Sequence, residues 1–258
     1  MVTKDQKEYR VVSFDLDGTI TESREAIEPY MCDLLSELSR KALVVIISGS
    51  SYKNILVQLD LFLKGSDKEV FKNTLLMPAN GSQTYFYSKA TNEWGLIDIT
   101  PMPFEVRRHV TDVLEKLIES GDFEVPRVGV GKQIEDRETQ IAFAALGIDA
   151  PLEQKKLWDP STEKRKKIVS SITNLLPETA IFIAGTTTID ILPKGINKGD
   201  MLEKMLEKRG LKKSDLLFIG DALYEGGNDY EVEKEGFTTI KTSGPKETAE
   251  IIKEILNK

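Results

Sequence analysis

Cysteine and histidine are nearly absent from this chain, which has one of each, Cys32 and His109. A single cysteine cannot form an intrachain disulfide, and a single histidine excludes a zinc site built from several histidines. It also makes a Ser-His-Asp triad a poor expectation. We interpret Cys32 as a residue on the flank of a helix and His109 as a surface residue, and the near absence of thiols fits a cytoplasmic protein.

The sequence also lacks a long hydrophobic run. Apolar stretches such as residues 42–47 are far shorter than the roughly 18 residues that a membrane span needs. No sufficiently long apolar stretch follows residues 1–7 as it would in an export signal. We therefore expect neither a membrane role nor export.

Positive charge is in short supply, because 35 lysines and arginines face 42 acidic residues and give a formal net charge of -7. The one basic run, Lys164–Lys167, lies in a segment with helical periodicity and is interpreted as a solvated helix face. Nucleic acid is therefore not an expected partner. With 40% hydrophobic residues in 258, the chain is predicted to fold, as one large domain or two smaller ones.

Short β-branched runs alternate with amphipathic stretches near the start of the chain. Strands that are apolar throughout and separated by helices predict a parallel sheet covered on both faces. The expected strands are residues 11–14, 43–47 and 74–77, and the expected helices are residues 27–38 and 52–63. From Lys198 the same alternation returns, with a strand at 216–219 and a terminal helix at 246–256.

The middle of the chain has a different order. It contains a predicted hairpin at 83–87 and 94–100, a helix at 105–118, strands at 127–134 and 140–146, a charged helix at 162–175 and a strand at 180–183. This order predicts a separate α+β domain, inserted as a cap over residues 84–186. Residues 1–83 and 187–258 then form the α/β core.

Two carboxylates, Asp15 and Asp17, follow the first predicted strand directly in the segment Phe14–Thr19. Carboxyl ends of parallel strands open onto the crevice where α/β proteins bind ligands. Repulsion between the two carboxylates is relieved by a cation or a proton, and magnesium suits paired oxygens beside a phosphate. An Asp-rich turn is the alternative. A calcium-binding EF-hand loop does not fit, because Thr19 and Ile20 stand at two of its required positions.

Two further residues lie at predicted strand or helix ends. Ser48 follows an apolar run and precedes Gly49, so it could bind a phosphate oxygen or cap the next helix. Lys198 opens a predicted helix, where a cation is unfavourable unless an anion is nearby. A bound phosphate would supply that anion, and a solvent-exposed lysine is the alternative.

A fourth polar segment, Gly220–Asp229, follows the predicted strand 216–219 and contributes Asp221 and Asp229. Its glycines permit tight backbone geometry at the same sheet edge. A plain surface loop is the alternative, since Asp and Gly favour turns. The four segments together predict one site.

These segments resemble the four motifs of the haloacid dehalogenase-like phosphatase superfamily, in the same order along the chain. An α+β insert between the second and third motifs resembles the type IIB cap subfamily. Further segments are similar to eukaryotic-type phosphomannomutases, namely residues 21–24, 78–81, 188–190 and 226–231.

The resemblance implies a covalent mechanism. Asp15 would attack phosphorus to form an aspartyl phosphate, and Asp17 would protonate the leaving oxygen and then deprotonate the acceptor. Ser48 and Lys198 would neutralise phosphoryl oxygens. The metal site for Mg²⁺ would comprise an Asp15 side-chain oxygen, the Asp17 carbonyl and Asp221, with Asp229 orienting metal-bound waters or Lys198.

The resemblance also implies a small phosphorylated substrate, with a cap that closes over the core. The residues matched to substrate binding are Arg24, Gly49, Arg137, Gln140, Thr188, Asp190 and Asn228. Arg137 and Gln140 could equally be surface side chains of a strand, and Asp190 could hold the cap hinge.

Two departures favour a phosphatase over a mutase. Phosphomannomutases place an arginine after a cap glycine where this chain has Ile148 after Gly147, and a glycine where it has Ser48. We therefore expect a magnesium-dependent phosphatase for a sugar phosphate or a similar metabolite. The alternatives are a phosphomannomutase-type mutase and a catalytically silent binding module, and the oligomeric state is left open.

Overall fold

The computed structural model describes residues 8–257, and the chain divides into two compact units. The core unit contains the chain up to Ile99, Asn197–Glu225 and the chain from Asp229 onward. The cap unit contains Thr100–Ile196 and Gly226–Asn228. In the described part of the chain, none of the helices is both long and apolar enough to cross a membrane.

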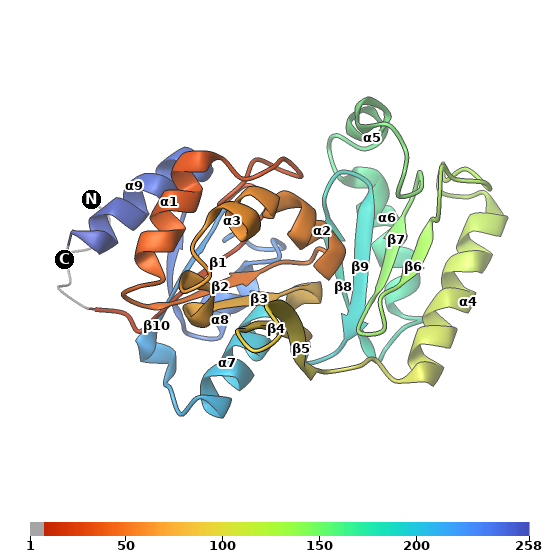
Figure 1. Ribbon diagram of the computed structural model, residues 1–258. Helices are drawn as coiled ribbons and strands as arrows, with labels where there is room; N and C mark the ends of the chain where they lie inside the picture. The colour runs from red at the N-terminus through yellow and green to blue at the C-terminus, as the bar shows by residue number, and fades with distance from the viewer. Residues whose placement is uncertain (1–7, 258) are drawn as a thin grey trace. The chain divides into compact units, whose positions relative to one another are not determined.

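The core unit is built on a seven-stranded sheet with the order β11-β10-β1-β2-β3-β4-β5 (Figure 1). Its parallel strands are β1 (Val11–Phe14), β2 (Leu43–Ile47), β3 (Thr74–Met77), β10 (Leu216–Gly220) and β11 (Thr238–Lys241). β4 (Gln83–Ser88) and β5 (Glu93–Ile99) add an antiparallel edge. This is the α/β core that the sequence predicts.

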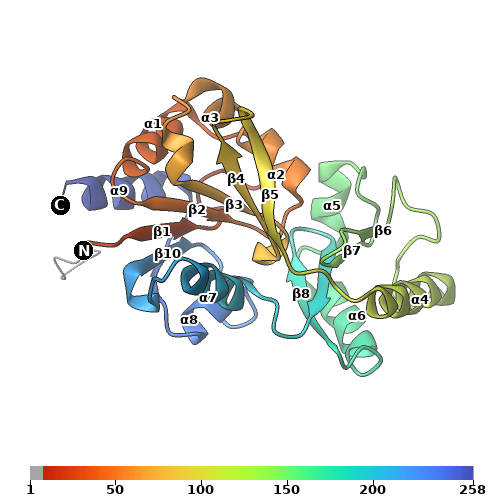
Figure 2. The ribbon, with the colours of Figure 1, turned by 60° about the horizontal axis from the view of Figure 1, so that its bottom comes forward.

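Helices cover both faces of this sheet, which is why its central strands are apolar throughout. In Figure 2, α1, α3 and α9 lie on one side of the sheet and α7 and α8 on the other. The helices are α1 (Pro29–Leu38), α2 (Tyr52–Gln58), α3 (Asp60–Gly65), α7 (Lys198–Lys208), α8 (Tyr230–Lys234) and α9 (Pro245–Leu256). Short 3₁₀ turns occur at Val70–Asn73, Ala79–Gly81 and Lys213–Asp215.

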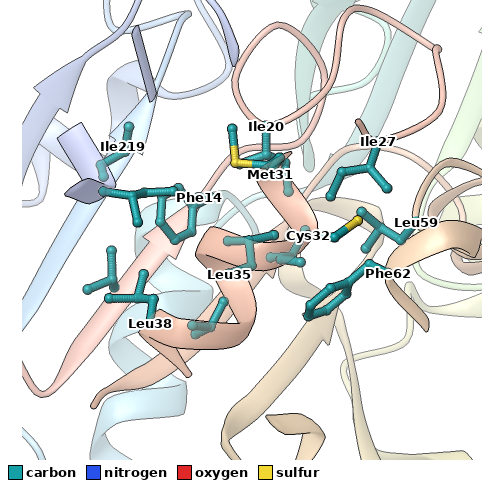
Figure 3. Packing of buried hydrophobic residues seen from close by; sticks show 14 of the residues in the cluster. Phe14, Ile20, Ile27, Met31, Cys32, Leu35, Leu38, Leu59, Phe62 and Ile219 are labelled. Carbon is teal, nitrogen blue, oxygen red and sulfur yellow. The ribbon is translucent and has the colours of Figure 1, made fainter. Parts of the chain in front are cut away.

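Side chains from β1 and α1 form the centre of the core beneath the sheet (Figure 3). Phe14 points from β1 toward Met31, Leu35 and Leu38, which recur on one face of α1, and all four are almost completely buried. Each such side chain contributes about 1.5–3 kcal/mol by leaving water. The packing holds β1 firmly, and β1 ends immediately before Asp15.

The cap unit contains a second, four-stranded antiparallel sheet with the order β6-β7-β9-β8. Its strands are β6 (Ile134–Asp136), β7 (Ile141–Ala144), β8 (Thr179–Ala184) and β9 (Thr188–Pro193), and its helices are α4 (Phe104–Ser120), α5 (Leu152–Trp158) and α6 (Glu163–Thr173). Helix α4 buries Val110, Leu114 and Leu117 in the cap core, three residues that share one helical face.

Three expectations about element boundaries need correction. The cap begins at Thr100 and ends at Ile196, not at 84 and 186, because the hairpin β4–β5 pairs with β3 in the core sheet and β9 pairs with β7 and β8. The strand expected at 127–134 is confined to Ile134–Asp136, and Val128 in the preceding loop is 86% exposed. The single helix expected at 52–63 breaks at Leu59 into α2 and α3.

A buried ion pair in the cap joins Arg165 of α6 to Asp159, the residue at the end of α5. The guanidinium of Arg165 donates to Asp159 Oδ2 at 2.8 Å, and the two side chains are 3% and 1% exposed. Arg165 also donates to the carbonyls of Ala184 and Gly185, while Asp159 accepts from the backbone N–H groups of Lys164 and Arg165. The Arg165 guanidinium and the Asp159 carboxylate thus both have hydrogen-bond partners within the cap.

We expect Asp159→Asn to destabilise the cap by about 3–5 kcal/mol, because it leaves the Arg165 guanidinium buried without its counter-charge. Burial acts to raise the pKa of Asp159, but the hydrogen bonds from Arg165 and the two backbone N–H groups outweigh it and lower the pKa. The wild-type contribution is therefore present above the ordinary carboxyl range near pH 4 and is lost as the pH falls through the lowered value.

Denaturant unfolding in a Trp94→Phe background measures this effect, since the other tryptophan, Trp158, packs against the cap core. The matched control is Lys166→Gln, which breaks a pair with Glu163 whose side chains are both 60% exposed. The control should change the unfolding free energy by less than about 1 kcal/mol. A similarly small change for Asp159→Asn would show that the buried pair does not stabilise the cap.

Candidate active site

The predicted carboxylates meet at the carboxyl edge of the core sheet. Asp15 follows β1 and Asp221 follows β10, and these strands are parallel neighbours with Phe14 opposite Ile219. Asp229 lies at the start of α8, and Lys198 is the first residue of α7. The structure thus brings together Asp15, Asp221, Asp229 and Lys198, as the sequence predicts.

Lys198 is fully buried and lies between two carboxylates. Its ammonium donates to Asp15 Oδ1 and, at 2.6 Å, to Asp229 Oδ1. The unfavourable position of a cation at a helix N-terminus is thus compensated by protein carboxylates, where the sequence suggested a phosphate. Burial opposes the charged form, but Asp15 and Asp229 outweigh it and raise the pKa of Lys198, so this lysine stays protonated.

Asp221 adds a third carboxylate beside the two that accept from Lys198. Oxygens of Asp15, Asp221 and Asp229 lie within 4.8 Å of one another. One ammonium cannot balance the charge of three carboxylate groups in this largely buried space. Burial raises the pKa of Asp15, against the opposing effect of Lys198, and raises the pKa of Asp221, to which Asp229 adds. A divalent cation with oxygen ligands fits both the charge and the donor set.

Two glycines allow the carboxylates to approach the backbone this closely. A Cβ at Gly18 would lie 2.7 Å from Asp221 Oδ2, and Gly18 has a φ of +79° that favours glycine. A Cβ at Gly220 would lie 2.4 Å from Asp229 Oδ2, the oxygen that also accepts from the backbone N–H of Ala222. The glycines of the Asp15 and Asp221 motifs are therefore required by the cluster itself.

Asp17 has a different environment from the three clustered carboxylates. Its Oδ1 accepts hydrogen bonds from the backbone N–H of Arg24 at 2.6 Å and from Gln58 Nε2 at 2.8 Å. Its Oδ2 accepts a longer one, 3.4 Å, from the hydroxyl of Ser50. Asp17 is thus held by neutral donors and not by an ammonium, an arrangement compatible with proton transfer.

Ser48 lies buried at the end of β2. Its hydroxyl accepts from the backbone N–H of Ser50 at 3.0 Å, and its carbonyl accepts from the N–H of Asn80 at 2.8 Å. Helix α2 is capped by Ser51, whose hydroxyl accepts from the N–H of Asn54. The helix-cap alternative for Ser48 is therefore wrong, and Gly49 follows it as a half-buried residue.

In the cap unit, Arg137 lies near Asp190, with 3.9 Å between Nη1 and Oδ1, and pairs with Glu135 at 2.6 Å. Register places Asp190 on β9 opposite Ala142 on β7, and Thr188 at the half-buried start of β9. Gln140 is fully buried beside β7. Arg137 and Gln140 thus lie in the turn between β6 and β7, and Thr188 and Asp190 lie on β9, the strand that pairs with β7.

The two other residues matched to substrate binding lie in loops. Arg24 is exposed with a left-handed φ of 63°, and its backbone N–H is the group that contacts Asp17. Asn228 is half-buried and immediately precedes Asp229.

Sequence reasoning missed Gln58, Ser50 and Lys155. Helical periodicity could have revealed Gln58, because it falls on the same face of the predicted helix as Ile55 and Leu59, both buried. Lys155 is buried in α5 and donates to the carbonyl of Ile148 at 2.7 Å. A cation is therefore present beside the position where the resemblance expects an arginine, a proximity that the sequence spacing does not show.

Comparisons with known proteins show which sequences and structures this chain resembles. A family model described as eukaryotic phosphomannomutase matches residues 31–258. The phosphomannomutase of Encephalitozoon cuniculi is 27% identical over 97% of this chain and 95% of its own length, and that of Schizosaccharomyces pombe is 26% identical over 96% and 94%.

Solved structures share the fold. A truncated Plasmodium falciparum IMP-nucleotidase aligns with a TM-score of 0.72 and 18% identity, over 96% of this chain and 70% of that one. A haloacid dehalogenase-like hydrolase from Bacteroides thetaiotaomicron aligns with a TM-score of 0.65 and 16% identity, over 96% and 100%.

Proposed function

This chain belongs to the eukaryotic phosphomannomutase family, within the haloacid dehalogenase-like superfamily, and we propose that it is a magnesium-dependent phosphatase of a sugar phosphate. In this proposal the reaction proceeds through an aspartyl phosphate at Asp15. The observation that carries this proposal is the buried Lys198 ammonium shared by Asp15 and Asp229, with Asp221 beside them. A silent binding module would have no need of this charge arrangement.

In the first half-reaction an Asp15 oxygen forms a bond to phosphorus and the bond from phosphorus to the sugar oxygen breaks. Asp17 gives its proton to that oxygen, so the sugar leaves as a neutral alcohol. Lys198 and Ser48 neutralise or hydrogen-bond the phosphoryl oxygens. Asp15, the Asp17 carbonyl and Asp221 would hold Mg²⁺, and Asp229 would orient metal-bound waters or Lys198. The bound metal would further neutralise the charge of the phosphoryl group.

In the second half-reaction Asp17 accepts a proton from water, and the resulting oxygen displaces Asp15 from phosphorus. Water is favoured as acceptor because Ile148 replaces an expected arginine of the cap and Ser48 replaces a glycine. Arg137, Gln140, Thr188 and Asp190 in the cap, with Arg24, Gly49 and Asn228, are proposed to recognise the substrate. Cytoplasmic location is part of the same proposal.

A second candidate, a phosphomannomutase-type mutase, is supported by one observation in the cap and by the names of the relatives. The Lys155 ammonium at the Ile148 carbonyl supplies a cation that could bind a distal phosphate. The relatives from Encephalitozoon cuniculi and Schizosaccharomyces pombe are both called phosphomannomutase. A mutase would transfer the phosphoryl group from Asp15 back to a sugar hydroxyl and exclude water.

Incubation with mannose 1-phosphate, Mg²⁺ and a catalytic amount of glucose 1,6-bisphosphate separates these outcomes by phosphorus NMR. We expect inorganic phosphate to accumulate, from this substrate or from another sugar phosphate in a panel, and to stop reversibly on chelation of the metal. Predominant formation of mannose 6-phosphate would contradict the phosphatase and support the mutase. Failure to move phosphate from any substrate would support the silent module.

A further inference from the structure

Helix α2 ends in a glutamine that none of the four sequence motifs includes. Gln58 is 5% exposed, and its amide Nε2 donates to Asp17 Oδ1 at 2.8 Å. Its backbone carbonyl accepts from the N–H of Ile27 at 2.8 Å. One residue therefore holds both the carboxylate of Asp17 and the far end of the loop that connects β1 to α1.

The setting of Gln58 favours an apolar residue. Its helical neighbours Ile55 and Leu59 are completely buried. The amide oxygen Oε1 is buried too, and among residues 8–257 it has no hydrogen-bond partner. A buried acceptor without a partner lowers stability, so a methionine or leucine would suit packing better. The contact with Asp17 is the polar interaction that this amide makes.

Asp17 also has other donors, but Gln58 differs from them. The backbone N–H of Arg24 belongs to the same loop as Asp17 and moves with it. The Ser50 hydroxyl is 3.4 Å away, at the long limit of a hydrogen bond. Gln58 is buried on a helix that packs against the core, so its contact ties Asp17 to a rigid element.

We propose that Gln58 is a positioning residue that fixes the Asp17 carboxyl in the orientation used for proton transfer. This inference rests on the proposed function, in which Asp17 gives its proton to the leaving oxygen as the bond from phosphorus to that oxygen breaks. Loss of the hydrogen bond from Gln58 to Asp17 should therefore slow the reaction most for substrates whose leaving oxygen needs that proton.

The test compares leaving groups. Gln58→Met keeps the length of the side chain and removes the amide donor. A sugar phosphate needs protonation of its leaving oxygen, whereas 2,4-dinitrophenyl phosphate releases a stable anion. For both substrates kcat/KM reports transfer to Asp15. General acid catalysis contributes about 10²–10⁴-fold to a rate. We therefore expect Gln58→Met to lower kcat/KM for the sugar phosphate by about 30-fold or more.

The dinitrophenyl substrate should lose less than about 3-fold under the same proposal. Asp17→Asn should show the same selectivity with a larger loss, and Val57→Met, on the exposed face of α2, should change neither value. Equal losses for both substrates, or no loss for either, in a variant with wild-type thermal stability would overturn the positioning role. If the wild type turns over neither substrate, the proposed function fails first, and the role of Gln58 falls with it.

Discussion

Asp15→Asn is expected to reduce kcat by at least about 10⁴-fold while the protein stays folded. The amide has the size of the carboxylate but is not a nucleophile toward phosphorus, and loss of a covalent nucleophile costs about this much or more. The amide oxygen can still accept from the Lys198 ammonium, and Asp229 still provides a counter-charge. The substitution also removes one of three crowded carboxylates, so the melting temperature should be unchanged or higher.

Single-turnover kinetics and thermal melting measure the two effects separately. Asp33→Asn on α1 is a matched control, since Asp33 is an exposed aspartate outside the cluster and the control should keep wild-type activity. A folded Asp15→Asn protein with more than a small fraction of wild-type turnover would remove Asp15 from the nucleophile role.

Lys198→Met is expected to damage stability and activity together. It leaves the carboxylates of Asp15 and Asp229 buried without their shared ammonium, and breaking a buried pair in this way costs about 3–5 kcal/mol. Activity should fall by about 10³-fold, since one charge that stabilises the phosphoryl oxygens is lost. Asp15→Asn is the useful contrast, because it should abolish activity without that loss of stability.

Lys208→Met at the other end of α7 controls for loss of a lysine. Lys208 pairs with Asp98, but these side chains are 60% and 40% exposed, so the unfolding free energy should change by less than about 1 kcal/mol. An equally small change for Lys198→Met would show that its ammonium does not hold the carboxylate cluster together.

The central strands and the carboxylate cluster could be predicted from sequence because their signals are local. Runs such as Leu43–Ile47 are apolar throughout, and the strand bounds follow the composition. Asp15 and Asp221 each follow such a run directly, and parallel strands bring their carboxyl ends together. The position of each aspartate directly after an apolar strand was therefore enough to predict this part of the site.

The parts that could not be predicted depend on pairings between distant segments. The hairpin Gln83–Ile99 has the same alternation of residues whether it pairs with a core strand or a cap strand, so the sequence could not decide between them. Its assignment to the cap was wrong, because β4 pairs with β3 of the core sheet. The contact of Lys198 with Asp229 and that of Gln58 with Asp17 join segments far apart in sequence. Lys155 meets Ile148 only through the fold of the cap, which composition does not reveal.

Chemical trapping during turnover tests most directly whether Asp15 carries the phosphoryl group. An acyl phosphate is reduced by borohydride to an alcohol, so a phosphorylated aspartate is converted to homoserine and is located by mass spectrometry of the peptides. We expect homoserine at position 15, only with substrate and Mg²⁺ present, and none in Asp15→Asn. Homoserine at another aspartate, phosphate found stably on Ser48, or full turnover with no trapped residue would contradict the covalent mechanism at Asp15.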